Sequence, residues 1–181
     1  MVVDNELSDQ HLIAGCLKND RRVQEKLYRR YANEMYSICL AYESDRDLAK
    51  DILQEAFIKV FKSIEQFDSR GSLKGWIRRI ITNTAIDFYR KKGLENKFVE
   101  VNQIADIAAE REDDLGDFGS SDILSQVKRL PEGARIIFNL FALEGYSHKE
   151  IAEKLNITEG TSKSQFSRAK QLLQDWIRYE V

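Results

Sequence analysis

The strongest structural signal in the sequence is the segment Ser147-His-Lys-Glu-Ile-Ala-Glu-Lys-Leu-Asn-Ile-Thr-Glu-Gly-Thr161. Ser147 and Glu150 have the spacing of a capping box, in which each side chain satisfies a backbone donor near the other. Asn156 suits the left-handed backbone of a tight turn. A second helix begins three residues later, so the stretch predicts a helix-turn-helix. The side chains expected to pack the turn are apolar: Ile151, Ala152, Leu155 and Ile157.

The second helix of this unit separates into two faces at about 100° per residue. Phe166, Ala169, Leu173 and Trp176 lie on one face, and Lys163, Ser164, Ser167 and Arg168 lie on the other. Lys and Arg donate to guanine in the major groove, and Ser contacts bases or phosphates. We expect a DNA-recognition helix; the alternative is an ordinary bundle helix with a solvated face.

The whole composition favours helices over sheets. The 181 residues include one proline and nine glycines, and 32% are charged, whereas a sheet protein needs many turn residues. There is no run of 18 apolar residues and no apolar signal core at the N-terminus. We therefore expect a cytoplasmic all-α protein with no membrane insertion.

Few residues of the chain suit catalysis or metal binding. His11 and His148 are the only histidines, and neither has the spacing of a base-nucleophile pair or a metal site. Cys16 and Cys39 lack the spaced pairs of a zinc site, so we interpret them as small apolar residues on helix faces. The sequence predicts no enzyme, no small-molecule substrate, no metal and no cofactor.

Charge is distributed unevenly along the chain. Residues 94–121 hold eight acids against Lys97 and Arg111, a net charge of -6 that leaves the remainder of the chain at +4. This segment also loses helical periodicity, and we interpret it as a flexible acidic linker. Its 28 residues reach about 90 Å when extended, at roughly 3.3 Å each, and about 30 Å when coiled.

Helices are expected on both sides of this linker. Before it, one helix is capped by Ser8, a second starts near Asp20, a third follows residues 43–47 and runs to about residue 66, and a fourth covers residues 73–92. Residues 67–72 form a loop between the last two. After the linker we expect helices over residues 122–129, 131–144, 147–155 and 159–179, with Pro131 in the first turn of its helix.

Two faces in the first half carry distinctive charge. The third helix presents Asp47, Asp51, Glu55 and Ile58 with Gln54 beside them, which suits a basic protein partner as well as solvent. In the fourth helix Arg79, Asn83, Ile86 and Arg90 should face outward, a cationic stripe with one amide suited to base edges. Its inward side is expected to hold Trp76, Ile77, Ile80, Thr84 and Phe88.

Here the sequence resembles the extracytoplasmic-function (ECF) sigma factors, the small promoter-specificity subunits of bacterial RNA polymerase. The matching stretches are Asp51-Ile-Leu-Gln-Glu-Ala-Phe-Ile-Lys-Val-Phe61, Gly75-Trp-Ile-Arg-Arg-Ile-Ile-Thr-Asn-Thr-Ala-Ile-Asp87, Leu130-Pro131 and Gly160-Thr-Ser-Lys-Ser-Gln-Phe-Ser-Arg-Ala-Lys170. Their order is that of the family. The resemblance implies a four-helix domain of the sigma region 2 type over residues 1–93, the linker over 94–121, and a four-helix domain of the region 4 helix-turn-helix type over 122–181.

The resemblance also implies partners: promoter DNA, the polymerase core through its clamp helices and its β flap, and an anti-sigma factor. Docking on the clamp helices falls to Asp47, Asp51, Gln54 and Glu55. Flipping a base out of the minus-ten element during melting costs a few kcal/mol. The resemblance assigns the capture of that base to Asp68, Ser69, Arg70, Gly71, Ser72, Leu73, Arg79, Asn83 and Arg90. Reading of the minus-thirty-five element falls to Thr161, Lys163, Ser164, Ser167, Arg168 and Lys170.

Two positions depart from the family pattern. Ser162 stands where the family commonly has Val, which predicts looser packing or an altered pose of the recognition helix. The loop Asp68-Ser-Arg-Gly-Ser matches only in part, so the preferred minus-ten base is open. The linker is expected to be extended between promoter boxes about 70 Å apart and to mimic phosphates with its acids.

The competing interpretation is a helix-turn-helix regulator that binds DNA alone and carries an effector or dimerisation domain in its N-terminal half. That class of protein needs a dimer contact or a ligand pocket. This chain has a basic helix bearing Asn83 instead. Co-purification with the polymerase core distinguishes the two classes.

Overall fold

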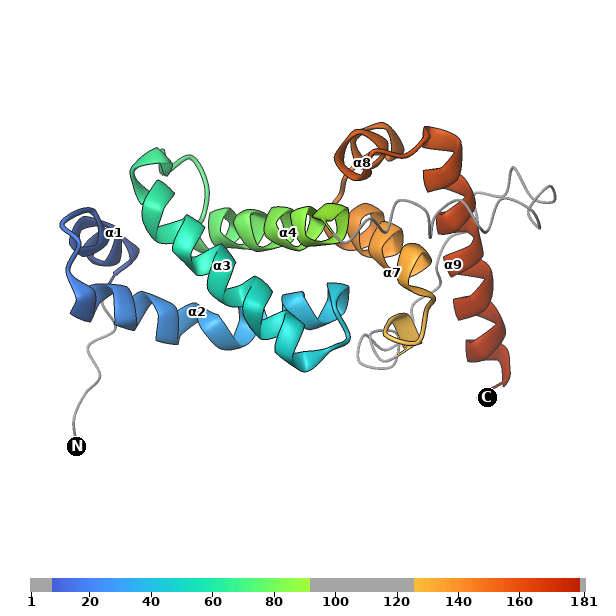
Figure 1. The fold of residues 1–181 in the computed structure, drawn as a ribbon, viewed down its shortest axis with the longest axis horizontal. Helices are drawn as coiled ribbons and strands as arrows, with labels where there is room; N and C mark the ends of the chain where they lie inside the picture. Colours follow the sequence, from blue (N-terminus) through green and yellow to red (C-terminus); the bar gives the residue numbers. More distant parts are fainter. Residues whose placement is uncertain (1–7, 92–125, 180–181) are drawn as a thin grey trace. The chain divides into compact units, whose positions relative to one another are not determined.

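The computed structural model describes residues 8–91 and 126–179, and within these ranges all regular structure is helical, as the composition predicts. The predicted linker, residues 94–121, lies outside the described residues. The chain divides into two compact units, Met1–Ala85 and Ile86–Val181, and the division falls inside helix α4, Leu73–Lys91. Each unit is described by itself below (Figure 1).

Helices α1 (Asp9–Leu17) and α2 (Arg21–Tyr42) begin at side-chain caps. Ser8 accepts a hydrogen bond from the backbone N–H of His11, and Asp20 accepts from Arg22, so both predicted starts are confirmed. These bonds satisfy donors that the first helical turn leaves without a partner. Asn19, in the left-handed region at φ 55°, reverses the chain between the two helices.

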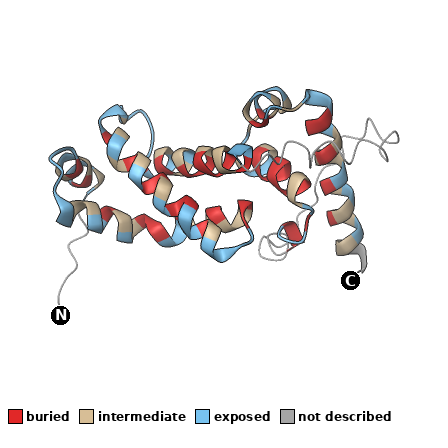
Figure 2. Cartoon of the chain, in the orientation of Figure 1, coloured by how far each residue is buried: buried red, intermediate tan, exposed pale blue. Residues whose placement is uncertain are grey.

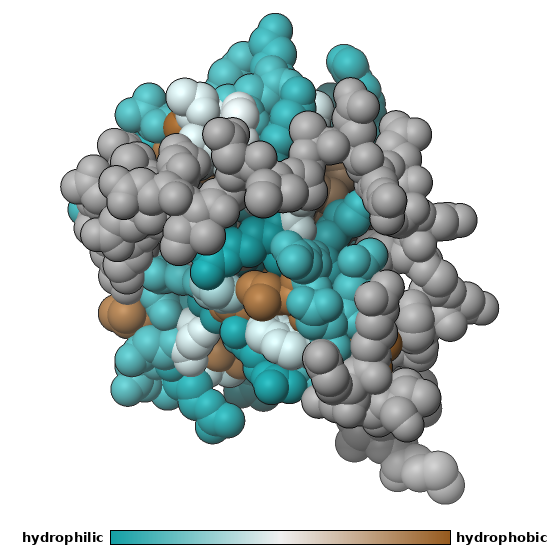
Figure 3. Space-filling model, turned by 90° about the vertical axis from the view of Figure 1, so that its right-hand side faces the viewer, coloured by the Kyte–Doolittle hydropathy of each residue, from teal (hydrophilic) through white to brown (hydrophobic). Residues whose placement is uncertain are grey.

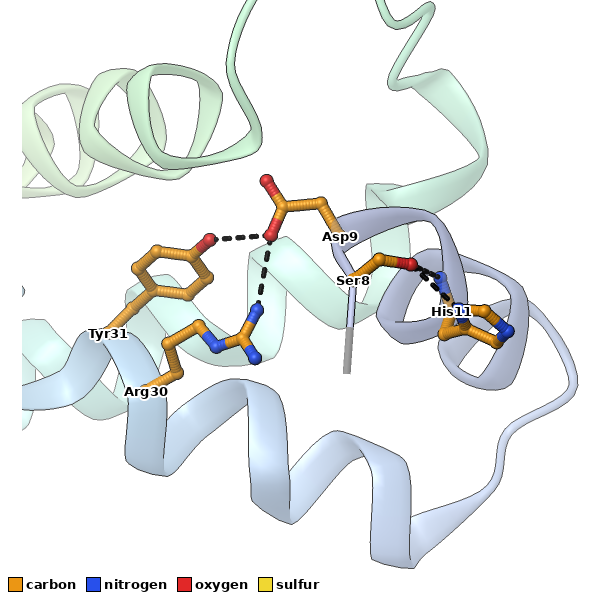
Figure 4. Close-up of polar contacts among 5 residues, drawn as sticks. All are labelled: Ser8, Asp9, His11, Arg30 and Tyr31. Atoms are coloured by element: carbon orange, nitrogen blue, oxygen red, sulfur yellow. Dashed lines mark hydrogen bonds and ion pairs between the residues drawn. The ribbon is translucent and has the colours of Figure 1, made fainter. Parts of the chain in front are cut away.

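Three polar side chains hold α1 on α2 (Figure 4). The Asp9 carboxylate accepts from the Tyr31 hydroxyl at 3.0 Å and from the Arg30 guanidinium at 3.3 Å. Burial and the bond to Asp9 raise the pKa of Tyr31, so the phenol stays protonated and keeps donating. Leu12 and Cys16 are buried on the inner side of α1, and α1 also contacts the short 3-10 helix η1, Ile64–Gln66.

Helix α3, Arg46–Ser63, starts at Asp45, which accepts from the backbone of Asp47 and Leu48. It packs along α2, where the Tyr28 and Phe57 rings meet edge to face at 4.8 Å. The chain then passes through η1 and a loop over residues 67–72 to α4. Both predicted helices and the loop between them are therefore confirmed.

The second unit contains α7 (Glu132–Phe138), the π-helical turn η2 (Asn139–Leu143), α8 (His148–Leu155) and α9 (Glu159–Tyr179). Along the helices of both units buried and exposed residues alternate with the helical turn (Figure 2), as expected for amphipathic helices. The core of the second unit joins α7 to α9, and its buried members are Val127, Leu130, Ala134, Phe138, Ala169 and Leu173.

Several details of the helices differ from the sequence predictions. The helix expected over residues 131–144 is α-helical only to Phe138, because the Glu144 N–H bonds to the Asn139 carbonyl five residues back and forms a wider turn. Pro131 is the residue before α7 and not part of its first turn.

Ile86 was expected to face outward, and this was wrong: it is 3% exposed, since the buried face of α4 is broad enough to include it. Of the helix expected over residues 122–129, residues 126 and 127 are helical, residues 128 and 129 are a turn, and the remainder lies outside the described residues.

Candidate nucleic-acid interface

The helix-turn-helix is built by the capping box and the turn that the sequence predicts. The Ser147 hydroxyl accepts from the Glu150 N–H at 3.3 Å, and the Glu150 carboxylate accepts from the Ser147 N–H at 2.8 Å. Because Ser147 donates to the ionised form, it lowers the pKa of Glu150. Helix α8 ends at Asn156 in the left-handed conformation, φ 55° and ψ 46°, with its N–H bonded to the Ala152 carbonyl. Both ends of α8 are confirmed.

Helix α9 has the two faces that its sequence predicts. Ala169 and Leu173 are buried, whereas Lys163 and Arg168 are exposed. Lys163 forms an ion pair with Glu159 at 2.8 Å, one turn earlier, which holds its ammonium group beside the start of the helix. The outer face of α9 therefore carries two exposed cations. On the face of the molecule drawn in Figure 3, hydrophilic residues surround small apolar spots.

The hydroxyl residues assigned to the minus-thirty-five site take part in the local structure. Thr158 caps α9 by accepting from the Thr161 N–H at 3.0 Å, and the two hydroxyls lie 2.8 Å apart. Thr161 is only 7% exposed. The Ser164 hydroxyl donates to the Thr161 carbonyl at 3.0 Å, and Ser164, Ser167 and Lys170 are half-buried.

The sequence did not predict the polar contact that Ser162 makes. Its side chain is 0% exposed, and its hydroxyl lies 2.9 Å from His148 Nδ1 on α8. The packing around Ser162 is thus closed and not loose. One sequence signal could have indicated this bond: a histidine at the start of the first helix of the helix-turn-helix and a serine near the start of the second.

The loop over residues 67–72 is braced by its own side chains. Asp68 accepts from the Arg70 N–H at 3.1 Å and forms an ion pair with the Arg70 guanidinium at 3.1 Å. Ser69 has a left-handed φ of 59°. Ser72 caps α4 by accepting from the Gly75 N–H at 3.0 Å. Residues 68–72 are exposed, so the loop presents a defined polar surface.

The residues around this loop on α4 differ in exposure. Leu73, assigned to the minus-ten site, is 1% exposed and belongs to the core. Arg79 and Arg90 are exposed and Asn83 is half-buried, and their spacing places them on one stripe. Trp76 was expected in the core, but it is half-buried and packs against the Phe67 ring at 5.6 Å, where the loop begins.

The acidic face of α3 is exposed opposite a buried one. Asp47, Asp51 and Gln54 are exposed, and Glu55 is half-buried with an ion pair to Lys59 at 3.3 Å. Ile58, on the same face, is 54% exposed. Sequence reasoning placed Ile58 on this face but did not count it among the docking residues.

Two negative findings concern the described part of the chain. It contains no group of three or more His, Cys, Asp or Glu residues that could hold a metal ion. None of its helices combines the length and the apolarity that crossing a membrane requires.

Comparisons with known proteins identify the class. The family model for sigma-70 region 2 matches residues 27–95, and that for sigma-70 region 4 matches residues 120–173. Together the two cover more than half of the chain. Regions 2 and 4 of the sigma-70 type define a promoter-specificity subunit of RNA polymerase.

Individual sigma factors from other bacteria are similar to this chain. The ECF RNA polymerase sigma-E factor of Haemophilus influenzae is 28% identical over 186 residues, covering 96% of this chain and 97% of the relative. The sigma-E factor of Escherichia coli K12 is 25% identical over 187 residues, with 97% of each chain covered. The sigma factor RpoE of Bartonella quintana, solved with the anti-sigma factor NepR, has a TM-score of 0.47 and 21% identity over 85% of this chain and 96% of its own.

The chain belongs to the ECF sigma factors of the sigma-70 family. It is a transcription initiation factor that binds RNA polymerase core and directs promoter-specific initiation.

Proposed function

We propose that this sigma factor has two functional domains joined by the acidic linker 94–121. Residues 1–93 bind the polymerase core and melt the promoter, and residues 122–181 read the minus-thirty-five element. The observation that carries the proposal is the outer face of α9. There Lys163 and Arg168 are exposed on a helix whose opposite face is buried, beside a capped α8. That is the geometry in which a helix-turn-helix presents cations to base edges.

Reading of the minus-thirty-five element is assigned to Lys163 and Arg168, with Ser164, Ser167, Thr161 and Lys170 in supporting contacts. Replacement of Lys163 or Arg168 by Ala should weaken promoter binding by the holoenzyme by about 1–3 kcal/mol. Lys18→Ala removes an exposed cation from the first unit and serves as the control. If Lys18→Ala and Arg168→Ala weaken promoter binding equally in a holoenzyme gel shift, α9 does not read the minus-thirty-five element.

Core docking is assigned to the exposed face of α3. Asp51 and Gln54 supply polar contacts, Asp47 and Glu55 extend the acidic surface, and the half-exposed Ile58 supplies an apolar anchor among them. An acidic rim around an apolar side chain suits a basic protein surface. The clamp helices of the largest polymerase subunit are the proposed partner, and the β flap is proposed to hold the second domain.

The docking assignment is tested by measuring the affinity of the sigma factor for the polymerase core. The double variant Asp51→Ala, Gln54→Ala should lose about 2 kcal/mol of binding free energy. Glu25→Ala is the matched control, because Glu25 is an exposed acid on α2 that forms an ion pair with Arg29 one turn later on the same helix. A double variant that binds core as tightly as Glu25→Ala would overturn the assignment.

Minus-ten capture is assigned to the loop Asp68, Ser69, Arg70, Gly71, Ser72 and Leu73 together with Arg79, Asn83 and Arg90. The braced loop supports this role, because a preformed pocket repays part of the few kcal/mol that base flipping costs. Since Leu73 is buried, we assign it the role of supporting the loop from the side of the core. Asn83→Ala should slow open-complex formation, measured with a fluorescent base in the minus-ten element, and leave core binding unchanged.

Membership in the family supports further proposals for this chain. The protein acts beside cytoplasmic polymerase and performs no catalysis of its own. An anti-sigma factor that covers α3 and α9 is proposed as its inhibitor. Deleting ten residues of the linker should abolish promoter activity, because the remaining residues no longer span the two boxes.

A further inference from the structure

A half-buried hydrogen bond joins the two helices of the helix-turn-helix. His148, the first residue of α8, lies with Nδ1 2.9 Å from the hydroxyl of Ser162 on α9. The Ser162 side chain is 0% exposed, and its backbone N–H donates to the Thr158 carbonyl. A serine inside a helix usually directs its hydroxyl to solvent or to the carbonyl four residues back. Here the hydroxyl reaches across to another helix.

Aromatic rings hold the histidine in place. The imidazole stacks on Phe141 of η2 with centroids 4.4 Å apart and an interplanar angle of 18°. It also meets Phe166 of α9 edge to face at 5.6 Å, and Phe141 and Phe166 lie 4.5 Å apart. The His148 ring, which belongs to α8, thus contacts both η2 and α9. Ser162 is its side-chain hydrogen-bond partner within this cluster.

The chemistry of the ring favours one arrangement. Burial, and next the charge of Lys163, lower the pKa of His148, while Glu159 opposes them. The ring is therefore neutral at physiological pH, with one donor and one acceptor nitrogen. If the Ser162 hydroxyl donates to Nδ1, the imidazole proton lies on Nε2.

Ser162 lies in the first turn of α9. It comes immediately before Lys163 and Ser164, which we assign to promoter reading. With side chains, a helix has a radius of about 5–6 Å, so a roll of 10° moves its surface by about 1 Å. A shift of about 1 Å is enough to break a hydrogen bond to a base edge. The contact that fixes the roll of α9 against α8 therefore controls which base Lys163 and Ser164 meet.

We propose that Ser162 and His148 form a positioning pair that fixes the pose of the recognition helix and thereby sets the base preference at the minus-thirty-five element. This rests on the proposed role of α9 in reading that element. His148 and Ser162 are positioning residues, and they need not touch a base themselves.

The test uses holoenzyme reconstituted from polymerase core and the full-length sigma factor. A promoter library with both boxes randomised is transcribed, and the productive templates are sequenced. Ser162→Thr and Ser162→Val are compared, because the two side chains have the same shape and only Thr keeps the hydroxyl. We expect Thr to select the wild-type minus-thirty-five sequence. We expect Val to lose about tenfold in preference at one or more of its positions, with the minus-ten sequence unchanged.

A spectroscopic readout accompanies the selection. In the 15N spectrum of the imidazole, wild type and Ser162→Thr should show the Nε2–H tautomer. Ser162→Val should show a mixture of tautomers. If Val prevents the second unit from folding, seen as lost helicity, Ser162→Ala replaces it, because the smaller side chain removes the hydroxyl without adding a methyl group.

The outcomes separate the two proposals. Identical minus-thirty-five selection by the Thr and Val variants, or by wild type and the Ala variant, would overturn the positioning pair and leave the role of α9 intact. If wild-type holoenzyme selects a minus-ten sequence but no minus-thirty-five sequence, the assignment of α9 itself fails.

Discussion

Replacing Gly15 by Ala tests how α1 packs on α2. A Cβ at residue 15 would lie 2.6 Å from Val23 Cγ1 and 2.7 Å from both Val23 Cβ and Cγ2. Such contacts require α1 or Val23 to move, and overpacking of this kind costs about 1–3 kcal/mol. Ala, however, favours a helix interior over Gly by about 1 kcal/mol. We expect the clash to prevail, with a net loss of about 1–2 kcal/mol in the free energy of unfolding.

The assay is urea or thermal unfolding of the full-length chain, followed by circular dichroism. A loss of 1 kcal/mol lowers the midpoint of a unit of this size by about 4–8 °C. The partner change Val23→Ala removes the two Cγ atoms and leaves the Val23 Cβ position at 2.7 Å, so the double variant should recover part of the loss caused by Gly15→Ala. Gly71→Ala is the control, because a Cβ there meets nothing within 4 Å.

The outcome matters for the minus-ten loop. Helix α1 contacts η1, and η1 leads directly into residues 67–72. A Gly15→Ala variant as stable as wild type, or a double-mutant cycle without coupling between residues 15 and 23, would refute the close packing of α1 on α2. The support that α1 gives to the loop through η1 would then be weaker than the structure indicates.

Three further predictions concern single sites. Asn156→Gly should leave stability nearly unchanged while Asn156→Ala costs about 1 kcal/mol in urea unfolding, because φ is 55° there. Cys16 and Cys39 are buried and burial raises the pKa of Cys39 to about 12, so neither thiol should react with Ellman's reagent at pH 8 until urea is added. Because burial lowers the pKa of His148 below its usual 6.5, the unfolded chain takes up the proton first, and stability should fall as the pH drops from about 6.5 through the lower folded pKa. The urea midpoint of His148→Gln should show a smaller fall over that range, and parallel curves would contradict this.

Features determined within three or four residues were predictable from the sequence. Ser8, Asp20 and Ser147 each cap a helix through a backbone donor two or three residues away. Asn156 bends the chain by its own backbone conformation. These interactions need no knowledge of the remainder of the fold, so propensity and spacing suffice.

Features that depend on a partner distant in the sequence were not predictable. The bond between Ser162 and His148 spans fourteen residues and depends on how two helices pack. Ile86 was placed outward because its neighbours in the periodic pattern are polar, but burial is decided by what covers the helix. The π-helical turn likewise gives no periodic signal in a pattern read at 3.6 residues per turn.

The polar residues assigned to DNA also maintain the elements that carry them. Ser72 accepts from the Gly75 N–H and so caps α4, yet its hydroxyl proton remains available to donate to a phosphate or base. Ser164 donates to the Thr161 carbonyl and keeps its acceptor lone pairs. The helices therefore limit what each hydroxyl can offer DNA: Ser72 keeps its proton and one lone pair, whereas Ser164 has used its proton and offers only an acceptor. A base edge opposite Ser164 must then present a donor such as an exocyclic amine, whereas Lys163 beside it requires an acceptor.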